Sequence, residues 1–206
     1  FSRIWSDAPK LLPYLSLPTR KLKINLSQQG NSRNLAENIT YTKTTTGKFI
    51  DMIPKTIHLC WFSNDPYPVE IKVCLDTWKR VLPDYTIRIW RYADAKAIGC
   101  TFIDEALAEK KWAFAADVVR FYAVYTEGGV YMDSDIFLYK RFDEFIPEHG
   151  FATFNEKIEK EQSVFGLQAA FFMGEKGNQY CKDVLDYYMN TSFKNADGSF
   201  NDTISP

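Results

Sequence analysis

The chain has 206 residues, 46% of them hydrophobic and 25% charged, which suits a folded domain and excludes a disordered or collagen-like chain. Its formal net charge of −1 at pH 7 lacks the basic excess that duplex nucleic-acid binding requires, so no nucleic-acid partner is expected. The four cysteines form no CxxC pair, which indicates free thiols in a reducing, cytoplasmic compartment.

Charge is unevenly distributed along the chain. Residues 1–51 contain 8 Lys and Arg against 3 Asp and Glu, whereas residues 52–206 contain 17 against 23. Pro9, Pro13 and Pro18 disfavour long helices in the first segment. We interpret residues 1–51 as a basic arm that precedes a domain over residues 52–206. Two interpretations of the arm remain open: peripheral contact with a membrane, or loose packing on the domain surface.

Apolar periodicity predicts alternating strands and helices from residue 55 onward. Strands are predicted over Lys55–Phe62, Tyr85–Trp90 and Val130–Leu138, and helices over Val69–Leu82, Asp94–Lys111 (in two pieces around Gly99), Trp112–Glu127 and Gln179–Met189. This order predicts an α/β fold with a mainly parallel central sheet and flanking helices. Ligands of such folds bind at the carboxyl ends of the strands.

The segment Tyr131-Met132-Asp133-Ser134-Asp135 contains a D-x-D pattern. On a strand, Tyr131, Asp133 and Asp135 would share one face, while Met132 would point into the core. Two neighbouring carboxylates repel each other and are costly to desolvate, so they favour a bound cation. Carboxylate ligands suit Mg²⁺ or Mn²⁺, and a diphosphate can fill the open positions of such an ion. A solvated strand end is the alternative for a lone D-x-D.

Asp117 and Arg120 lie at i and i+3 on the helix that precedes this strand, among the apolar neighbours Ala116 and Val118. An exposed pair at this spacing would contribute only about 0.2–0.5 kcal/mol. The apolar surroundings instead predict a buried pair. Because the chain turns back at Gly128-Gly129, we expect three carboxylates and one guanidinium to converge on one cleft.

Three segments, in the same order along the chain, resemble the signatures of the D-x-D sugar transferases of glycosyltransferase family 32. They are Ile53–Phe62 (IPKTIHLCWF), Ala116–Arg120 (ADVVR) and Gly128–Asp135 (GGVYMDSD). The resemblance runs from about Ile53 to about Met189, with bacterial capsular polysaccharide transferases as the nearest kind and the glucosylating domains of clostridial toxins more distant. It implies a GT-A fold and a UDP- or GDP-linked sugar donor whose anomeric configuration is retained.

The resemblance also implies roles for individual residues. Asp135 matches a direct ligand of Mn²⁺ or Mg²⁺, and Asp133 matches a residue that binds the metal through water or contacts the ribose. Asp117 and Arg120 match the helix pair that grips hydroxyls of the donor sugar. Together with Asp135, they are the candidate catalytic residues.

Four further residues complete the expected site. Trp61 matches the aromatic side chain that stacks on the base, with a core tryptophan as the alternative. Tyr131 matches a tyrosine near the sugar or phosphate, and Gln168 an amide that faces the sugar. His58 is expected to hold its strand by a hydrogen bond to the backbone rather than to act as a base.

We therefore predict a hexosyltransferase of capsular or surface polysaccharide synthesis, acting on a glycan or lipid-linked glycan at the inner face of the membrane. Three alternatives stay open: a toxin-like protein glucosyltransferase, a catalytically weakened nucleotide-sugar or carbohydrate-binding module, and a metal-dependent phosphohydrolase. Relatives continue beyond the position of Pro206, so the domain is expected to be truncated at its C-terminus. Loops around residues 64–68 and 154–168 are expected to decide the sugar and the acceptor.

Overall fold

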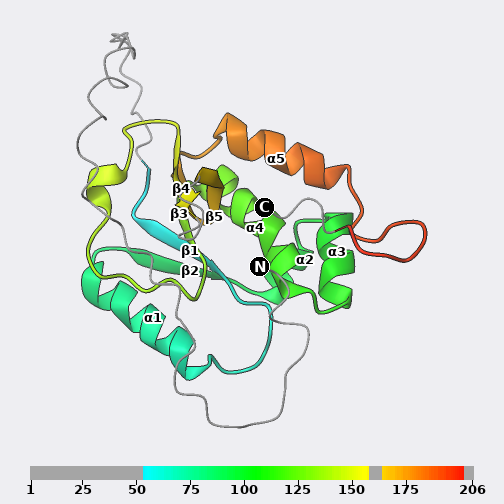
Figure 1. The fold of residues 1–206 in the computed structure, drawn as a ribbon, viewed down its shortest axis with the longest axis horizontal. Coiled ribbons are helices and arrows are strands. Elements are labelled where there is room, and N and C mark those ends of the chain that lie inside the picture. Colours follow the sequence, from blue (N-terminus) through cyan, green and yellow to red (C-terminus); the bar gives the residue numbers. More distant parts are fainter. Residues whose placement is uncertain (1–52, 158–163, 202–206) are drawn as a thin grey trace.

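The computed structural model describes residues 53–157 and 164–201, so the predicted arm over residues 1–51 lies outside the described residues. A five-stranded sheet in the order β2-β1-β3-β5-β4 forms the centre (Figure 1). The strands are β1 (Thr56–Cys60), β2 (Thr86–Trp90), β3 (Gly129–Met132), β4 (Phe151–Lys157) and β5 (Val164–Gly174). β1 pairs in parallel with β2 and β3, whereas β5 pairs antiparallel with β3 and β4. The sheet is therefore parallel over β2-β1-β3 and continues as an antiparallel hairpin.

Helices cover both faces of the sheet (Figure 1). One face carries α1 (Val69–Val81), and the other carries α2 (Tyr92–Lys96), α3 (Thr101–Ala108), α4 (Trp112–Glu127) and α5 (Gln179–Met189). A short 3-10 helix, η5 (Asp143–Phe145), lies between β3 and β4. None of the helices in the described ranges is long and apolar enough to span a bilayer.

Side chains of β3 alternate between the two faces of the sheet. Val130 and Met132 belong to the buried cluster that includes Trp78 of α1, whereas Tyr131 packs with Phe172 on the face covered by α4. The sequence predicts this alternation for residues 130–132, and the structure confirms it. The predicted helices are also confirmed, including the two-piece helix around Gly99.

Two expectations about the strands are wrong. The strand predicted over Val130–Leu138 ends at Met132, because a tight turn follows in which the Ile136 amide donates to the Asp133 carbonyl (3.2 Å). Residues 154–157 and 164–168, expected to belong to a loop, instead lie in β4 and β5, which form an antiparallel hairpin. Residues 170–173 of β5 are all buried, so they lack the alternation of polar and apolar residues that marks a half-exposed strand.

The turn from α4 into β3 requires glycine. Gly128 and Gly129 have φ angles of +71° and +115°, which L side chains rarely adopt. A Cβ atom on Gly129 would lie 2.6 Å from the Thr56 carbonyl oxygen and 3.1 Å from His58 Nε2. This close approach lets β3 pair with β1 immediately after the helix ends.

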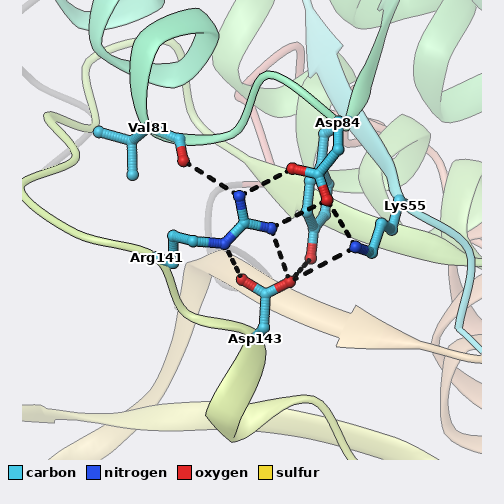
Figure 2. Close-up of polar contacts among 6 residues, drawn as sticks. Lys55, Val81, Asp84, Arg141 and Asp143 are labelled. Carbon is cyan, nitrogen blue, oxygen red and sulfur yellow. Dashed lines mark hydrogen bonds and ion pairs between the residues drawn. The ribbon is translucent and has the colours of Figure 1, made fainter.

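A cluster of charged side chains ties the segment after β3 to the base of the sheet. Figure 2 shows Arg141 between Asp84 and Asp143, with Lys55 beside Asp84. Arg141 contacts both oxygens of Asp84 (2.8 and 3.0 Å) and both oxygens of Asp143 (2.8 and 3.0 Å). Hydrogen bonds from Arg141 hold the pKa of both carboxyls below the usual range. The segment that follows the D-x-D turn is thus anchored at the end of the sheet where β1 and β2 begin.

Candidate active site

Arg120 is the centre of a buried polar cluster between α4 and the sheet. Its Nη2 lies 2.6 Å from an oxygen of Asp117 and 3.9 Å from an oxygen of Asp133, and the side chains of Arg120 and Asp117 are only 8% and 7% exposed. Its Nη1 donates to the Ala169 carbonyl of β5 (2.8 Å), and its Nε donates to the Ala116 carbonyl (3.2 Å). The predicted burial of the Asp117–Arg120 pair is confirmed.

Each nitrogen of the Arg120 guanidinium therefore has a partner within the protein. Burial alone would lower the pKa of Arg120, but the charge of Asp117, followed by Tyr131 and Asp133, raises it, so the guanidinium stays charged. The structure makes Arg120 the group that connects Asp117 on α4 with Asp133 at the end of β3.

Tyr131 holds Asp133 from the other side. Its hydroxyl donates to Asp133 Oδ1 (2.7 Å), and its ring lies 5.1 Å from the Arg120 guanidinium. Burial, and then the charge of Asp133, raises the pKa of Tyr131 well above its ordinary value, so the phenol remains a hydrogen-bond donor. One carboxylate oxygen of Asp133 is thereby fixed in orientation, while its side chain keeps 30% exposure to solvent.

Asp135 lies on the exposed side of the turn after β3. The expectation that Asp133 and Asp135 alternate on one strand face is wrong, because the strand has already ended. The negative charge of Asp135 acts on Cys74 of α1. Burial is the main cause that raises the pKa of the Cys74 thiol, and the charge of Asp135 is the second. The described contacts therefore gather Asp117 and Asp133 around Arg120 and leave Asp135 nearer to solvent, rather than all three carboxylates in one buried cleft.

Within the described ranges, no group of three or more His, Cys, Asp and Glu side chains is arranged to hold a metal ion. The donor chemistry of the turn nevertheless fits a hard divalent cation, because Asp133 and Asp135 supply carboxylate oxygens at a solvent-accessible position. With Asp117 they make three carboxylates against one guanidinium, an excess of negative charge that a divalent cation would balance. Two protein ligands suffice for an ion that keeps water and phosphate in its remaining positions.

Trp61 directly follows β1 and lies at the same edge of the sheet as the D-x-D turn, since β1 and β3 are parallel neighbours. It is half-buried, and its ring lies 4.7 Å from the ring of Tyr67. Its Nε1 donates to the Asp65 carbonyl (3.2 Å), which fastens the following loop. Trp61 is thus neither a fully buried core residue nor a freely exposed one.

Gln168 lies on β5, two residues before Ala170, whose carbonyl accepts a hydrogen bond from the Asp133 amide (2.9 Å). Its Oε1 accepts a hydrogen bond from the Ala170 amide (3.3 Å), and the side chain lines a pocket between the hairpin, α4 and α5. Gln168 is connected to the Arg120 cluster through its neighbours: the Ala169 carbonyl accepts from Arg120 and the Ala170 carbonyl accepts from the Asp133 amide.

His58 has the structural role that the sequence predicts. Its ring is fully buried; Trp90 Nε1 donates to its Nδ1 (3.2 Å), so its Nε2 carries the proton and donates to the Gly128 carbonyl (2.7 Å). Burial lowers the pKa of His58, which keeps the ring neutral. A neutral ring with both nitrogens engaged is not available as a base.

Two members of the cluster were not predicted from the sequence. The first is the Ala169 carbonyl, which accepts a hydrogen bond from Arg120. The second is Cys60 at the end of β1, which lies close enough to Arg120 and Asp133 for their charges to affect the pKa of its thiol. Burial is the main cause that raises the pKa of Cys60, so this thiol is unreactive. A backbone carbonyl has no signal in a sequence, and a partly buried cysteine resembles any other small apolar residue.

Comparison with known protein families supports the resemblance to D-x-D sugar transferases. Residues 68–152 match the family described as a glycosyltransferase sugar-binding region containing a DXD motif. The match covers the Ala116–Arg120 and Gly128–Asp135 segments and begins after the Ile53–Phe62 segment. The predicted resemblance is confirmed over residues 68–152.

Among solved structures, six chains match. One is the PaToxG glycosyltransferase, with 21% sequence identity and a TM-score of 0.54 over 66% of this chain and 60% of that one. At this identity the similarity establishes a shared α/β fold and nothing more specific. A comparison with curated proteins finds no match.

Proposed function

We propose that this protein transfers a hexose from a UDP- or GDP-linked sugar to a hydroxyl group of a glycan, with retention of the anomeric configuration. The observation that carries the proposal is the buried Asp117–Arg120–Asp133 cluster, which lies at the carboxyl end of β3 inside a matched glycosyltransferase region. Residues 52–206 would then be the catalytic domain.

The charge of the cluster suits a diphosphate leaving group. Asp133 and Asp135 would hold Mn²⁺ or Mg²⁺, which when bound supplies positive charge next to the diphosphate. Arg120 keeps Asp133 in place and adds a fixed positive charge behind it. Fixed charges aimed at the position where charge develops are usually the largest contribution to catalysis.

Asp117 and Arg120 have different roles in this proposal. All three guanidinium nitrogens of Arg120 already have partners in the protein, which favours a positioning role over direct contact with the sugar. Asp117, held by its ion pair with Arg120, would contact a hydroxyl of the donor sugar. It would also stabilise positive charge that develops on the sugar ring.

Two aromatic residues would complete the donor site. Trp61 lies at the same edge of the sheet as the D-x-D turn and is only half-buried, which suits stacking on the base. Tyr131 acts through Asp133, whose orientation its hydroxyl fixes.

The proposed transfer takes place in one step, without a covalent intermediate on a protein nucleophile. The acceptor hydroxyl would form a bond to the anomeric carbon on the face from which the diphosphate leaves, as the bond from that carbon to the diphosphate oxygen breaks. The proton of the hydroxyl would pass to the departing diphosphate. This internal-return route accounts for retention and agrees with the absence of an evident nucleophile among the residues assigned to the site.

The resemblance to capsular polysaccharide transferases favours a glycan or lipid-linked glycan acceptor, met at the inner face of the membrane through the basic residues 1–51. A protein acceptor is the competing possibility. Supplying membrane-derived glycan acceptors and candidate protein acceptors in parallel, and detecting the labelled product, separates the two.

The donor assignment is tested by calorimetric titration of UDP and GDP with and without Mn²⁺. The double variant Asp133→Asn/Asp135→Asn is expected to lose metal-dependent nucleotide binding while retaining the wild-type circular dichroism spectrum. Asp76→Asn, an exposed carboxylate on α1, is the matched control and is expected to bind as the wild type does. Unchanged affinity in the double variant would contradict the metal assignment. Nucleotide binding without turnover on any donor and acceptor would instead favour a binding module.

A further inference from the structure

A hollow lies beside the Arg120 cluster, between α4, α5 and the β4–β5 hairpin. It has a volume of about 280 Å³, and Ala169 is part of its lining. The Ala169 carbonyl accepts the hydrogen bond from Arg120 Nη1, so the hollow and the proposed donor site share one stretch of backbone. We refer to it as the hairpin pocket.

Four aromatic side chains line the hairpin pocket, and each ring contacts two of the others. Phe121 stacks on Phe172 (4.8 Å between ring centroids), Phe172 contacts Phe151 (5.4 Å), Phe151 contacts Tyr180 (4.6 Å), and Tyr180 lies 6.2 Å from Phe121. Phe172 is buried, but Tyr180 is 43% exposed and Leu167 at the rim is 52% exposed. A cluster that served only packing would cover its large apolar groups, whereas exposed apolar groups around a hollow are typical of a binding site.

The polar groups of the hairpin pocket are few and held in place. Thr153 Oγ1 lies 2.5 Å from the Gln168 carbonyl oxygen and 3.0 Å from the Phe171 carbonyl oxygen, and its one proton links β4 to this part of β5. The Ala170 amide holds Gln168 Oε1. Within the described ranges, this contact of the Gln168 side chain uses its oxygen, so the two N–H groups of the amide can donate to a ligand.

We propose that the hairpin pocket binds one pyranose ring of the acceptor, an inference that rests on the proposed function. The C–H groups on one face of a pyranose are apolar and pack on aromatic rings, while its hydroxyls accept hydrogen bonds from an amide such as that of Gln168. The volume lies just below the roughly 300–1,000 Å³ of pockets that hold drug-sized ligands, so it suits a single ring. Its place beside Arg120 puts a bound acceptor next to the proposed donor site.

The experiment measures binding of free sugars to the full chain, without nucleotide or metal. The probes are methyl glycopyranosides of glucose, galactose, mannose and N-acetylglucosamine, followed by saturation-transfer NMR, with benzyl alcohol as a purely apolar probe. At least one glycoside is expected to bind. Tyr180→Ala and Gln168→Ala are each expected to weaken that binding about tenfold, because they remove a stacking surface or an N–H donor.

Three further variants complete the test. Tyr187→Ala alters an exposed tyrosine (53%) on the same helix that is not part of the lining, so it should bind the glycoside as the wild type does. Tyr180→Leu removes the aromatic ring but keeps apolar volume, so it is the substitute if Tyr180→Ala does not fold. Asp133→Asn/Asp135→Asn should lose nucleotide binding and keep glycoside binding, which separates failure of the donor site from failure of the hairpin pocket.

The proposal is overturned if none of the four glycosides binds, or if benzyl alcohol binds and they do not. It is also overturned if the glycoside binds equally well to Tyr180→Ala and Gln168→Ala.

Discussion

Replacement of Arg120 by methionine tests the central cluster most directly. The substitution keeps most of the side-chain volume and removes the charge, so Asp117, with a side chain 7% exposed, is left without its 2.6 Å partner. Removing one partner of a buried ion pair typically costs about 3–5 kcal/mol, because the remaining charge stays desolvated. Hydrogen bonds to the Ala116 and Ala169 carbonyls are lost as well, so we expect a loss near the upper end of this range.

The measurement is urea unfolding at pH 7, followed by tryptophan fluorescence and far-UV circular dichroism. A double-mutant cycle with Asp117→Asn isolates the pair: removing both charges should be less destabilising than the sum of the two single changes by about 1–3 kcal/mol. Arg80→Met, on an exposed position of α1, should change stability by no more than about 0.5 kcal/mol. A loss below about 1 kcal/mol for Arg120→Met, or additive single changes, would refute the proposed cluster.

Three further predictions concern the frame around the site. Gly129→Ala should destabilise the fold by about 2 kcal/mol or more, because its Cβ would lie 2.6 Å from the Thr56 carbonyl oxygen at a positive φ. Burial lowers the pKa of His58 below 6.5, so unfolding becomes easier as the pH falls below 6.5, and His58→Gln should abolish that part of the pH dependence. Because Arg141 depresses the pKa of Asp84 below 3.8, the stability that Arg141→Gln removes should be fully present above pH 3.8 and shrink as the solution becomes more acidic.

Thermal unfolding at a series of pH values checks the two pH predictions. A wild-type melting temperature that stays flat below pH 6.5 would argue against a buried neutral histidine. An Arg141→Gln difference that grows with acidity would contradict the ion-pair account. For the glycine, Gly177→Ala is the control, since its φ is also positive but a Cβ atom there meets nothing within 4 Å. Equal losses in the two variants would mean that backbone conformation, rather than the close approach to β1, is the cause.

Local patterns in the sequence identified the helices and the first two strands because each has one dominant signal. The stripe of apolar residues on α4 and the two glycines after it specify a helix and its end without reference to the rest of the chain. The D-x-D pattern likewise stands out because paired carboxylates beside an apolar strand are costly without a cation. The apolar surroundings of Asp117 and Arg120 were sufficient to predict their burial.

Tertiary structure alone decided how those residues meet. The D-x-D carboxylates flank a turn and not a strand face, because the backbone bends after Met132 where the Asp133 carbonyl accepts a local hydrogen bond. The hairpin escaped prediction because β5 is covered on both faces, which removes the alternation that identifies a strand. Arg120 is held by the Ala169 carbonyl, 49 positions away in the chain. Periodicity in a sequence reflects contacts within one helix or strand, so it cannot predict a contact between a side chain and a distant backbone group.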